Sequence, residues 1–349
     1  MNKERVSYAG KRIYIGLDVH RMFFVASCIC EGEVIKRCRL PSTSEAVLEF
    51  IRKYFKGAEI KTCYEAGYSG FWLHRALEGD GISNIVVHAA HVEMEVNRVK
   101  TDKRDSLKLA QQLSTGRLRG IRIPSEEEEE GRVLTRTREQ LSRAKRRAQI
   151  QIRMRLHQFG LFPSWIQSVI QPAHIKNILE KLPSEDLKFS IELLYVQWIE
   201  CKEKIKKIDK RLAEQAKIDP LQAAYRSVPG IGPLIARVLS KELEDMSQFR
   251  NEKVLFSFTG LTPGEYSSGH KVCRGHISRQ GSSRLRHMLV EAAWKAIRKD
   301  TALREFYERL SARCGKKRAI VAVARKLVGR IRAALRARVV YEVGYKKVA

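Results

Sequence analysis

Four acidic residues in the first third of the sequence are spaced so that they can surround divalent metal ions. Asp18 and Glu65 stand at the ends of two short apolar, β-branched runs of the kind that form buried strands. Asp102 and Asp105 are three residues apart at the start of a predicted helix, where positions i and i+3 point the same way. Carboxylate oxygens suit Mg²⁺ or Mn²⁺, and two such ions clamp the attacking and leaving oxygens of an in-line displacement. The set therefore predicts phosphodiester chemistry.

Any one of these acids alone is equally typical of a solvated strand end or of a helix N-terminus, where Asp and Glu are favoured. Their ordered appearance within about ninety residues of a strand-rich region favours the metal site.

The elements that must position these acids occupy residues 1–120, for which we predict an α/β domain. Three strands are expected in succession over 13–19, 23–30 and 34–40, followed by a helix with a capping box of Ser42 and Glu45. A strand over 60–64, a helix over 71–77, a strand over 85–88 and the helix of Asp102 complete the pattern. A meander followed by alternating helices and strands is the order of an RNase H-like fold, in which acids at strand ends meet in one cleft.

Residues 121–218 predict a helical coiled-coil region. Five glutamates at 126–130 precede a very basic helix, where they favour the helix dipole. A second helix carries an apolar seam with steps of three and four, formed by Ile191, Leu194, Trp198, Cys201, Ile205, Ile208 and Leu212. Either the two helices pack antiparallel within one chain or the seam pairs protomers. We expect it to have a role in assembly.

Residues 219–349 predict a mainly helical domain that opens with a glycine turn. Gly230 and Gly232 lie in Val-Pro-Gly-Ile-Gly, a turn that exposes backbone N–H groups to a phosphate, as in a helix-hairpin-helix contact with DNA. A tight helix connection without a ligand explains the same pattern. The basic surroundings favour DNA.

Two adjacent serines follow in a glycine-flanked loop. Ser267 or Ser268 becomes a nucleophile only if its proton is removed and cations stabilise the charge of the transition state, whereas loop serines are more often simple turn residues. Several cations follow the serines and are predicted to contact phosphate: Lys271, Arg274, Arg279, Arg284 and Arg286.

The formal charge of +28 on 349 residues is concentrated in two segments. Residues 271–349 carry 22 Lys and Arg against 5 Asp and Glu, and residues 131–160 carry 9 against 1. Such concentration is typical of proteins that bind nucleic-acid backbones.

The N-terminus lacks an apolar signal core and no apolar run is long enough to span a bilayer, so we expect a cytoplasmic protein without membrane contact.

Taken together, the motifs resemble those of the DEDD-type transposases of bacterial insertion sequences, which are bridge-RNA-guided serine recombinases. The resemblance covers roughly residues 12–335 and rests on the order of its pieces: Gly16-Leu17-Asp18, Tyr64-Glu65-Ala66, Lys100-Thr101-Asp102 with Asp105, Pro229 to Gly232, Phe258 to Pro263, and Ser268-Gly269 followed by Gly281 and Leu285-Arg286.

The resemblance implies a DEDD metal site for Mg²⁺ or Mn²⁺ formed by Asp18, Glu65, Asp102 and Asp105, and it selects Ser268 as the nucleophile. It further implies a covalent phosphoserine intermediate with a free 3′-hydroxyl, and strand exchange through a junction. A noncoding bridge RNA that pairs with donor and target DNA is implied as well. So is a homo-oligomer, a dimer or tetramer, in which the acids of one chain meet the serine of another.

Two other functions use the same residues. A metal-dependent nuclease of the Holliday-junction type would need the acids but would use water as its nucleophile. A noncatalytic nucleic-acid-binding protein would need only the basic charge.

Overall fold

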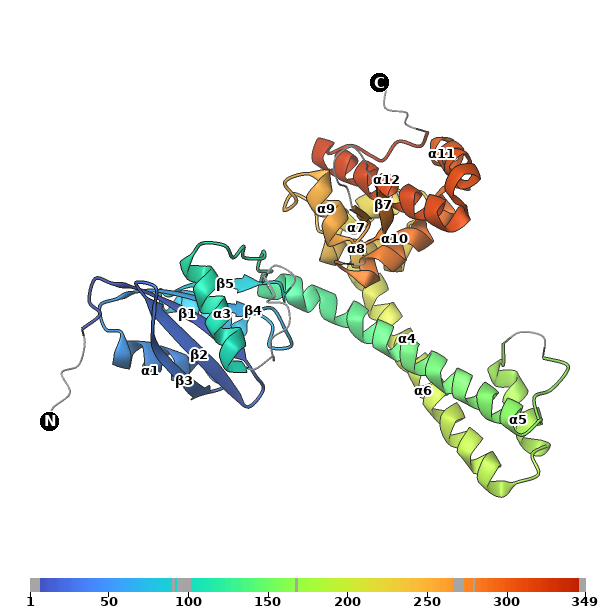
Figure 1. The fold of residues 1–349 in the computed structure, drawn as a ribbon. Coiled ribbons are helices and arrows are strands. Elements are labelled where there is room, and N and C mark those ends of the chain that lie inside the picture. The colour runs from blue at the N-terminus through green and yellow to red at the C-terminus, as the bar shows by residue number, and fades with distance from the viewer. Residues whose placement is uncertain are drawn as a thin grey trace. The chain divides into compact units, whose positions relative to one another are not determined.

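The computed structural model describes residues 7–89, 92, 102–166, 169–265, 273–278 and 280–344, with only the backbone described at 102, 103 and 274. The chain forms two compact units, Met1–Pro124 and Ser125–Ala349 (Figure 1). The finer division into 1–120, 121–218 and 219–349 stays a prediction.

The first unit is built on a mixed five-stranded sheet. Its strands are β1 (Arg12–Val19), β2 (Phe23–Cys30), β3 (Glu33–Pro41), β4 (Glu59–Glu65) and β5 (Ser83–Val87), in the order β3-β2-β1-β4-β5. β1, β2 and β3 form the expected antiparallel meander, and β4 and β5 continue the sheet in parallel with β1. The predicted RNase H-like arrangement is confirmed for this unit.

Helices cover both faces of this sheet (Figure 1). On one face, α1 (Ser44–Tyr54) and α2 (Trp72–Gly79) join a core that includes Ile13, Ile15 and Leu17 of β1. On the other face lies α3 (Asp102–Ser114), which packs over β1, β2 and β4. The cap expected at Ser42 is one residue later, because the Thr43 side chain accepts the hydrogen bond from the Ala46 N–H.

The second unit is largely helical. Its helices are α4 (Glu126–Gln158), α5 (Pro172–Glu180), α6 (Glu185–Ala216), α7 (Pro220–Arg226), α8 (Pro233–Glu242), α9 (Glu252–Phe258), α10 (Ser283–Ala296), α11 (Thr301–Cys314) and α12 (Lys316–Ala337). A short hairpin of β6 (Pro263–Glu265) and β7 (Arg274–Ile277) lies between α9 and α10. Among the described residues, no helix has the length and apolar character needed to cross a membrane.

The long helices α4 and α6 pack side by side and antiparallel, as the ion pair of Arg138 with Asp209 near one end and the contact of Arg155 with Ser190 near the other require (Figure 1). The apolar seam of α6 faces α4 of the same chain, with Ile191 and Trp198 buried in their common core. The alternative in which the two helices pack within one chain is therefore the correct one. The assembly role expected for this helical region stays a prediction.

A cluster of ion pairs joins α4 to α8 and α10. Glu242, which is only 9% exposed, lies 3.1 Å from Arg136 and 3.0 Å from Arg284. The Arg132 side chain donates a hydrogen bond of 2.7 Å to the carbonyl of Lys241. Buried ion pairs add little net stability, but removing one partner leaves an uncompensated charge, so these contacts fix how the helices meet.

The turn between α7 and α8 is packed tightly against α10. Gly230 has a φ of +87°, and a Cβ on it would lie 2.4 Å from the Ala292 carbonyl oxygen. Gly232, two residues later, is the N-cap of α8 and would place a Cβ in open space. The two glycines of the predicted phosphate-binding turn therefore have different surroundings.

We expect Gly230→Ala to destabilise the second unit. The left-handed backbone costs a side chain about 1–2 kcal/mol, and the overpacking costs about 1–3 kcal/mol more. The matched variant Gly232→Ala is expected to lose about 1 kcal/mol or less, since only an N-cap preference changes. Thermal unfolding followed by circular dichroism compares the two, and equal midpoints would contradict the packing role of Gly230.

Candidate active site

Asp18 and Glu65 lie side by side at the ends of neighbouring parallel strands. β1 and β4 pair in a register that joins Gly16 to Cys63 and Leu17 to Tyr64, so the next position in this register joins the two acids. Side chains alternate along a strand, and Asp18 and Glu65 therefore point to the same face as Gly16 and Cys63. This is the face that α3 covers.

The N-terminal half of α3 is held very close to that face. A Cβ on Gly16 would lie 2.1 Å from the Ser106 carbonyl oxygen and 2.5 Å from the Ala110 nitrogen. The hydroxyl groups of Ser27 and Ser106 form a buried hydrogen bond of 2.9 Å. The helix therefore fits against β1 because position 16 carries no side chain.

A second contact ties α3 to β4. The Cys63 thiol donates to the Leu109 carbonyl at 3.5 Å. Burial raises the pKa of Cys63, and the negative charge of Glu65 raises it further, which agrees with both side chains being on this face. Asp105 directly precedes Ser106 in the turn of α3 that contacts the sheet.

The structure thus brings Asp18, Glu65 and Asp105 to the side of the sheet that α3 covers, and it confirms the helix that begins at Asp102. The side chain of Asp102 lies outside the described residues. Within the described part of the chain, no three His, Cys, Asp or Glu side chains are grouped closely enough to hold a metal ion. The donor chemistry fits Mg²⁺ or Mn²⁺, since all four predicted ligands are carboxylates.

His20 contacts one of the predicted ligands, Asp18, and was not among the residues predicted from the sequence. Its Nε2 lies 3.0 Å from an Asp18 carboxylate oxygen, and its ring packs against Phe23 with centroids 5.0 Å apart. The contact orients the Asp18 side chain in the way that a carboxylate partner orients a ligand at metal sites. The available signal was the Asp-x-His spacing, which places His20 directly after the end of β1 and two residues from Asp18.

The loop that contains the candidate serines is closed by main-chain hydrogen bonds at its base. The Ser278 N–H donates to the Thr262 carbonyl, and the Ser282 N–H donates to the Phe258 carbonyl, each at 2.9 Å. These bonds anchor the β6–β7 hairpin to the end of α9 and the start of α10. The residues between the two strands include Ser267, Ser268 and Lys271, which lie outside the described residues, as do Arg279 and the side chain of Arg274.

Arg284 and Arg286, the other two residues predicted to contact phosphate, have described side chains, and both contact groups of the protein itself. Arg284 forms ion pairs with Glu139 at 2.8 Å and with Glu242 at 3.0 Å. The Arg286 guanidinium lies against Gly260 and donates to its carbonyl at 3.5 Å. Their assignment as phosphate contacts stays a prediction, as does that of Gly230 and Gly232.

Comparison with known proteins identifies similar chains over most of this length. A family model for DEDD transposases of the IS110 type, described as "Transposase", matches residues 15–161. A second model, described as "Transposase IS116/IS110/IS902 family", matches residues 222–308. The two matches contain the acid site and the serine loop, respectively.

Individual relatives extend the similarity to nearly the full chain. A putative transposase of Sinorhizobium fredii, y4qE, is 26% identical over 91% of this chain and 87% of its own length. Another from the same organism, y4rJ, is 30% identical over 76% of this chain and 74% of its own. The transposase for insertion sequence element IS1111A of Coxiella burnetii is 26% identical over 74% of this chain and 73% of its own length.

We expect Gly16→Ala to damage the acid site, because the added Cβ meets backbone atoms of α3 and the helix must move. Overpacking of this kind costs about 1–3 kcal/mol, and a displacement of about 1 Å in an active site costs about 100-fold in rate. Thermal unfolding and a DNA strand-cleavage assay measure the two effects.

The control is Gly79→Ala at the end of α2, where a Cβ would have no neighbour within 4 Å. It is expected to leave cleavage unchanged and to alter stability by less than about 1 kcal/mol. A Gly16→Ala protein as stable and as active as this control would refute the close packing of α3.

Proposed function

The chain belongs to the IS116/IS110/IS902 family of transposases, enzymes of DNA transposition, and we propose that it acts as an RNA-guided serine recombinase of a bacterial insertion sequence. The observation that carries the proposal is the pairing of Asp18 and Glu65 under α3 in one unit, together with a serine loop anchored between α9 and α10 in the other. The predicted metal ligands are thus supported by the packing of α3 on the sheet, and the predicted nucleophile by the anchored ends of its loop.

In the proposed reaction the Ser268 hydroxyl oxygen attacks a DNA phosphorus. A phosphoserine bond forms, the bond from phosphorus to the 3′ oxygen breaks, and the leaving 3′ oxygen receives a proton. A 3′-hydroxyl of the exchanging strand then attacks the phosphoserine, which restores the DNA linkage and returns the serine hydroxyl. Both steps exchange one phosphodiester for another, so no external energy source is required.

A DEDD transposase domain implies the use of divalent metal. We propose that Asp18, Glu65, Asp102 and Asp105 hold Mg²⁺ or Mn²⁺, which when bound supplies positive charge that polarises the scissile phosphate. The role of His20 in this proposal is to keep the Asp18 carboxylate in one orientation, through the 3.0 Å contact.

The partners we propose are double-stranded donor and target DNA, a noncoding bridge RNA that pairs with both, and further copies of the chain. Basic charge makes contact with DNA and RNA physically reasonable. An apolar stripe on the side of α6 that faces away from α4 supports the proposed oligomer. Its side chains Phe189, Leu193 and Val196 are 63%, 56% and 53% exposed. A dimer or tetramer would cover this stripe and would allow acids and serine to come from different chains.

The serine assignment is tested by trapping the covalent intermediate. Wild-type protein and the Ser267→Ala variant are expected to form a protein–DNA adduct on element-end DNA that survives denaturing electrophoresis. Ser268→Ala is expected to form none, because the attacking oxygen is gone. An active Ser268→Ala protein would contradict the mechanism and would favour a nuclease that uses water.

The acid assignment is tested by a neutral substitution at the strand end. Glu65→Gln keeps the size of the side chain but removes its charge, and we expect strand cleavage to fall at least about 100-fold with the fold preserved. Glu49→Gln, at an exposed position of α1, is the matched control and should cleave normally. Cleavage by Glu65→Gln at the control rate would reject Glu65 as a ligand.

A further inference from the structure

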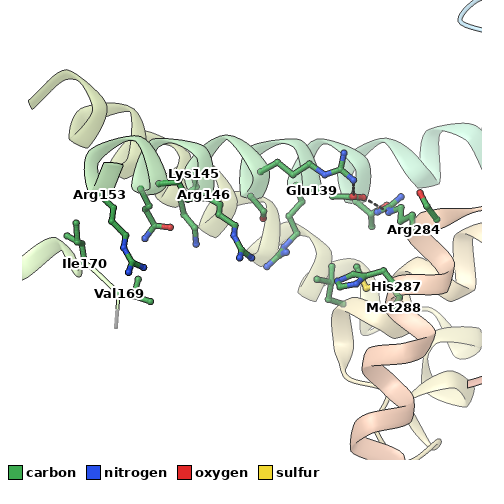
Figure 2. Close-up of a pocket in the computed structure, with 17 residues that line it drawn as sticks. Glu139, Lys145, Arg146, Arg153, Val169, Ile170, Arg284, His287 and Met288 are labelled. Atoms are coloured by element: carbon green, nitrogen blue, oxygen red, sulfur yellow. Dashed lines mark hydrogen bonds and ion pairs between the residues drawn. The ribbon is translucent and has the colours of Figure 1, made fainter. Parts of the chain in front are cut away.

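A groove of about 940 Å³ runs along α4 within the second unit (Figure 2). Its walls are formed by one side of α4, by the start of α10 and by residues Val169 and Ile170. We call it the α4 groove. It is lined by six basic side chains besides His287: Arg138, Arg143, Lys145, Arg146, Arg153 and Arg284. Glu139 is the one acidic side chain in the described lining.

The cations at the α10 end of the groove are held by carboxylates. Arg284 is paired with both Glu139 and Glu242, and Arg143 is paired with Glu139. Burial lowers the pKa of Arg284, and the charges of Glu242 and Glu139 oppose this effect. These contacts join α4 to α8 and α10, so the groove is a preformed feature of the unit.

The cations farther along α4 are not neutralised in this way. In the described part of the chain, no carboxylate forms an ion pair with Lys145, Arg146 or Arg153. The Arg153 guanidinium lies 5.4 Å from the Phe162 ring centroid, and its Nε is 3.5 Å from His157. Figure 2 shows Arg146 and Arg153 extending from α4 on the side of Val169 and His287.

The spacing of the cations suits a chain of phosphates. Lys145 and Arg153 are separated by about 12 Å along α4, a length over which one strand of a duplex presents about three or four phosphates. The volume of the groove lies in the range of clefts that hold a single ligand, and its course along α4 suits an extended backbone. Positive charges gathered in a cleft also focus the electrostatic potential there. A protein partner fits poorly, since the centres of protein interfaces are depleted in charge.

We propose that the α4 groove binds the sugar–phosphate backbone of one nucleic-acid strand through Lys145, Arg146 and Arg153. The proposal rests on the proposed function in so far as a recombinase of this kind has nucleic-acid partners. DNA and RNA offer the same phosphodiester chemistry to the groove. The lining of the groove includes none of the predicted acids and neither candidate serine, so its binding can be tested without any cleavage step.

The test compares two triple variants that lose the same charge. The groove variant is Lys145→Gln, Arg146→Gln, Arg153→Gln. The control is Arg147→Gln, Lys202→Gln, Lys206→Gln, three exposed cations of the same two-helix hairpin that do not line the groove. Binding of the full-length proteins to fluorescent duplex DNA, duplex RNA and single strands of each is measured by anisotropy over a salt series, with a chelator present to prevent cleavage.

The groove variant is expected to bind at least about tenfold more weakly than the control at 0.1 M salt. The slope of log affinity against log salt should also fall by about 2.7 for duplex DNA or about 2 for a single strand, relative to wild type. Loss with DNA alone, with RNA alone or with both supports the groove and identifies its ligand. If both triple variants show the same affinity and slope for all four probes, the groove is not a binding site.

The same assay separates this proposal from the catalytic one. The groove assay measures affinity with the chelator present, whereas the serine assay measures formation of the adduct, so the two proposals have separate readouts. Failure of the serine mechanism would therefore leave the groove result intact. Unchanged affinity of the groove variant would refute the groove without bearing on the adduct experiment.

Discussion

The acid site depends on the close approach of α3 to β1 at Gly16. A side chain at this position would overlap the backbone of the helix, with a Cβ only 2.1 Å from the Ser106 carbonyl oxygen. The hydrogen bond between Ser27 and Ser106 and the contact of Cys63 with the Leu109 carbonyl hold the helix on either side of that point. Asp105 is therefore carried by a packed helix and not by a mobile loop, which is what a precise metal site requires.

A different constraint organises the second unit. Glu242 is buried and must keep its cationic partners, so α4, α8 and α10 are joined at one place in the structure. The joint leaves a groove beside α4 in which some cations are neutralised and others are not. Some of the 67 Lys and Arg are thus neutralised by carboxylates within the fold, and the net excess of +28 is available to a polyanion.

Sequence patterns predicted the local features of both units. The β-branched runs predicted all five strands of the sheet, and the spacing of Asp102 and Asp105 predicted the start of α3. The seam of α6 was predicted as a seam, but its partner was not, because a heptad pattern specifies an apolar face and not the surface that covers it. The Thr43 cap was missed by one residue because Ser42 and Thr43 are adjacent and both belong to the residue types favoured at an N-cap.

Features that depend on residues far apart could not be predicted. The phosphate contact predicted for Arg284 from its basic neighbourhood stays a prediction. Its pairing with Glu139 was not predicted, because it joins positions separated by more than a hundred residues. The α4 groove likewise exists only because α10 meets α4.

The most direct test of the central claim, that the strand-end acids form a metal site, is the affinity of the full-length chain for Mn²⁺ measured by electron paramagnetic resonance. The account predicts that Asp18→Asn weakens binding at least about tenfold while Glu49→Gln leaves it unchanged; equal affinity in all three proteins would contradict it.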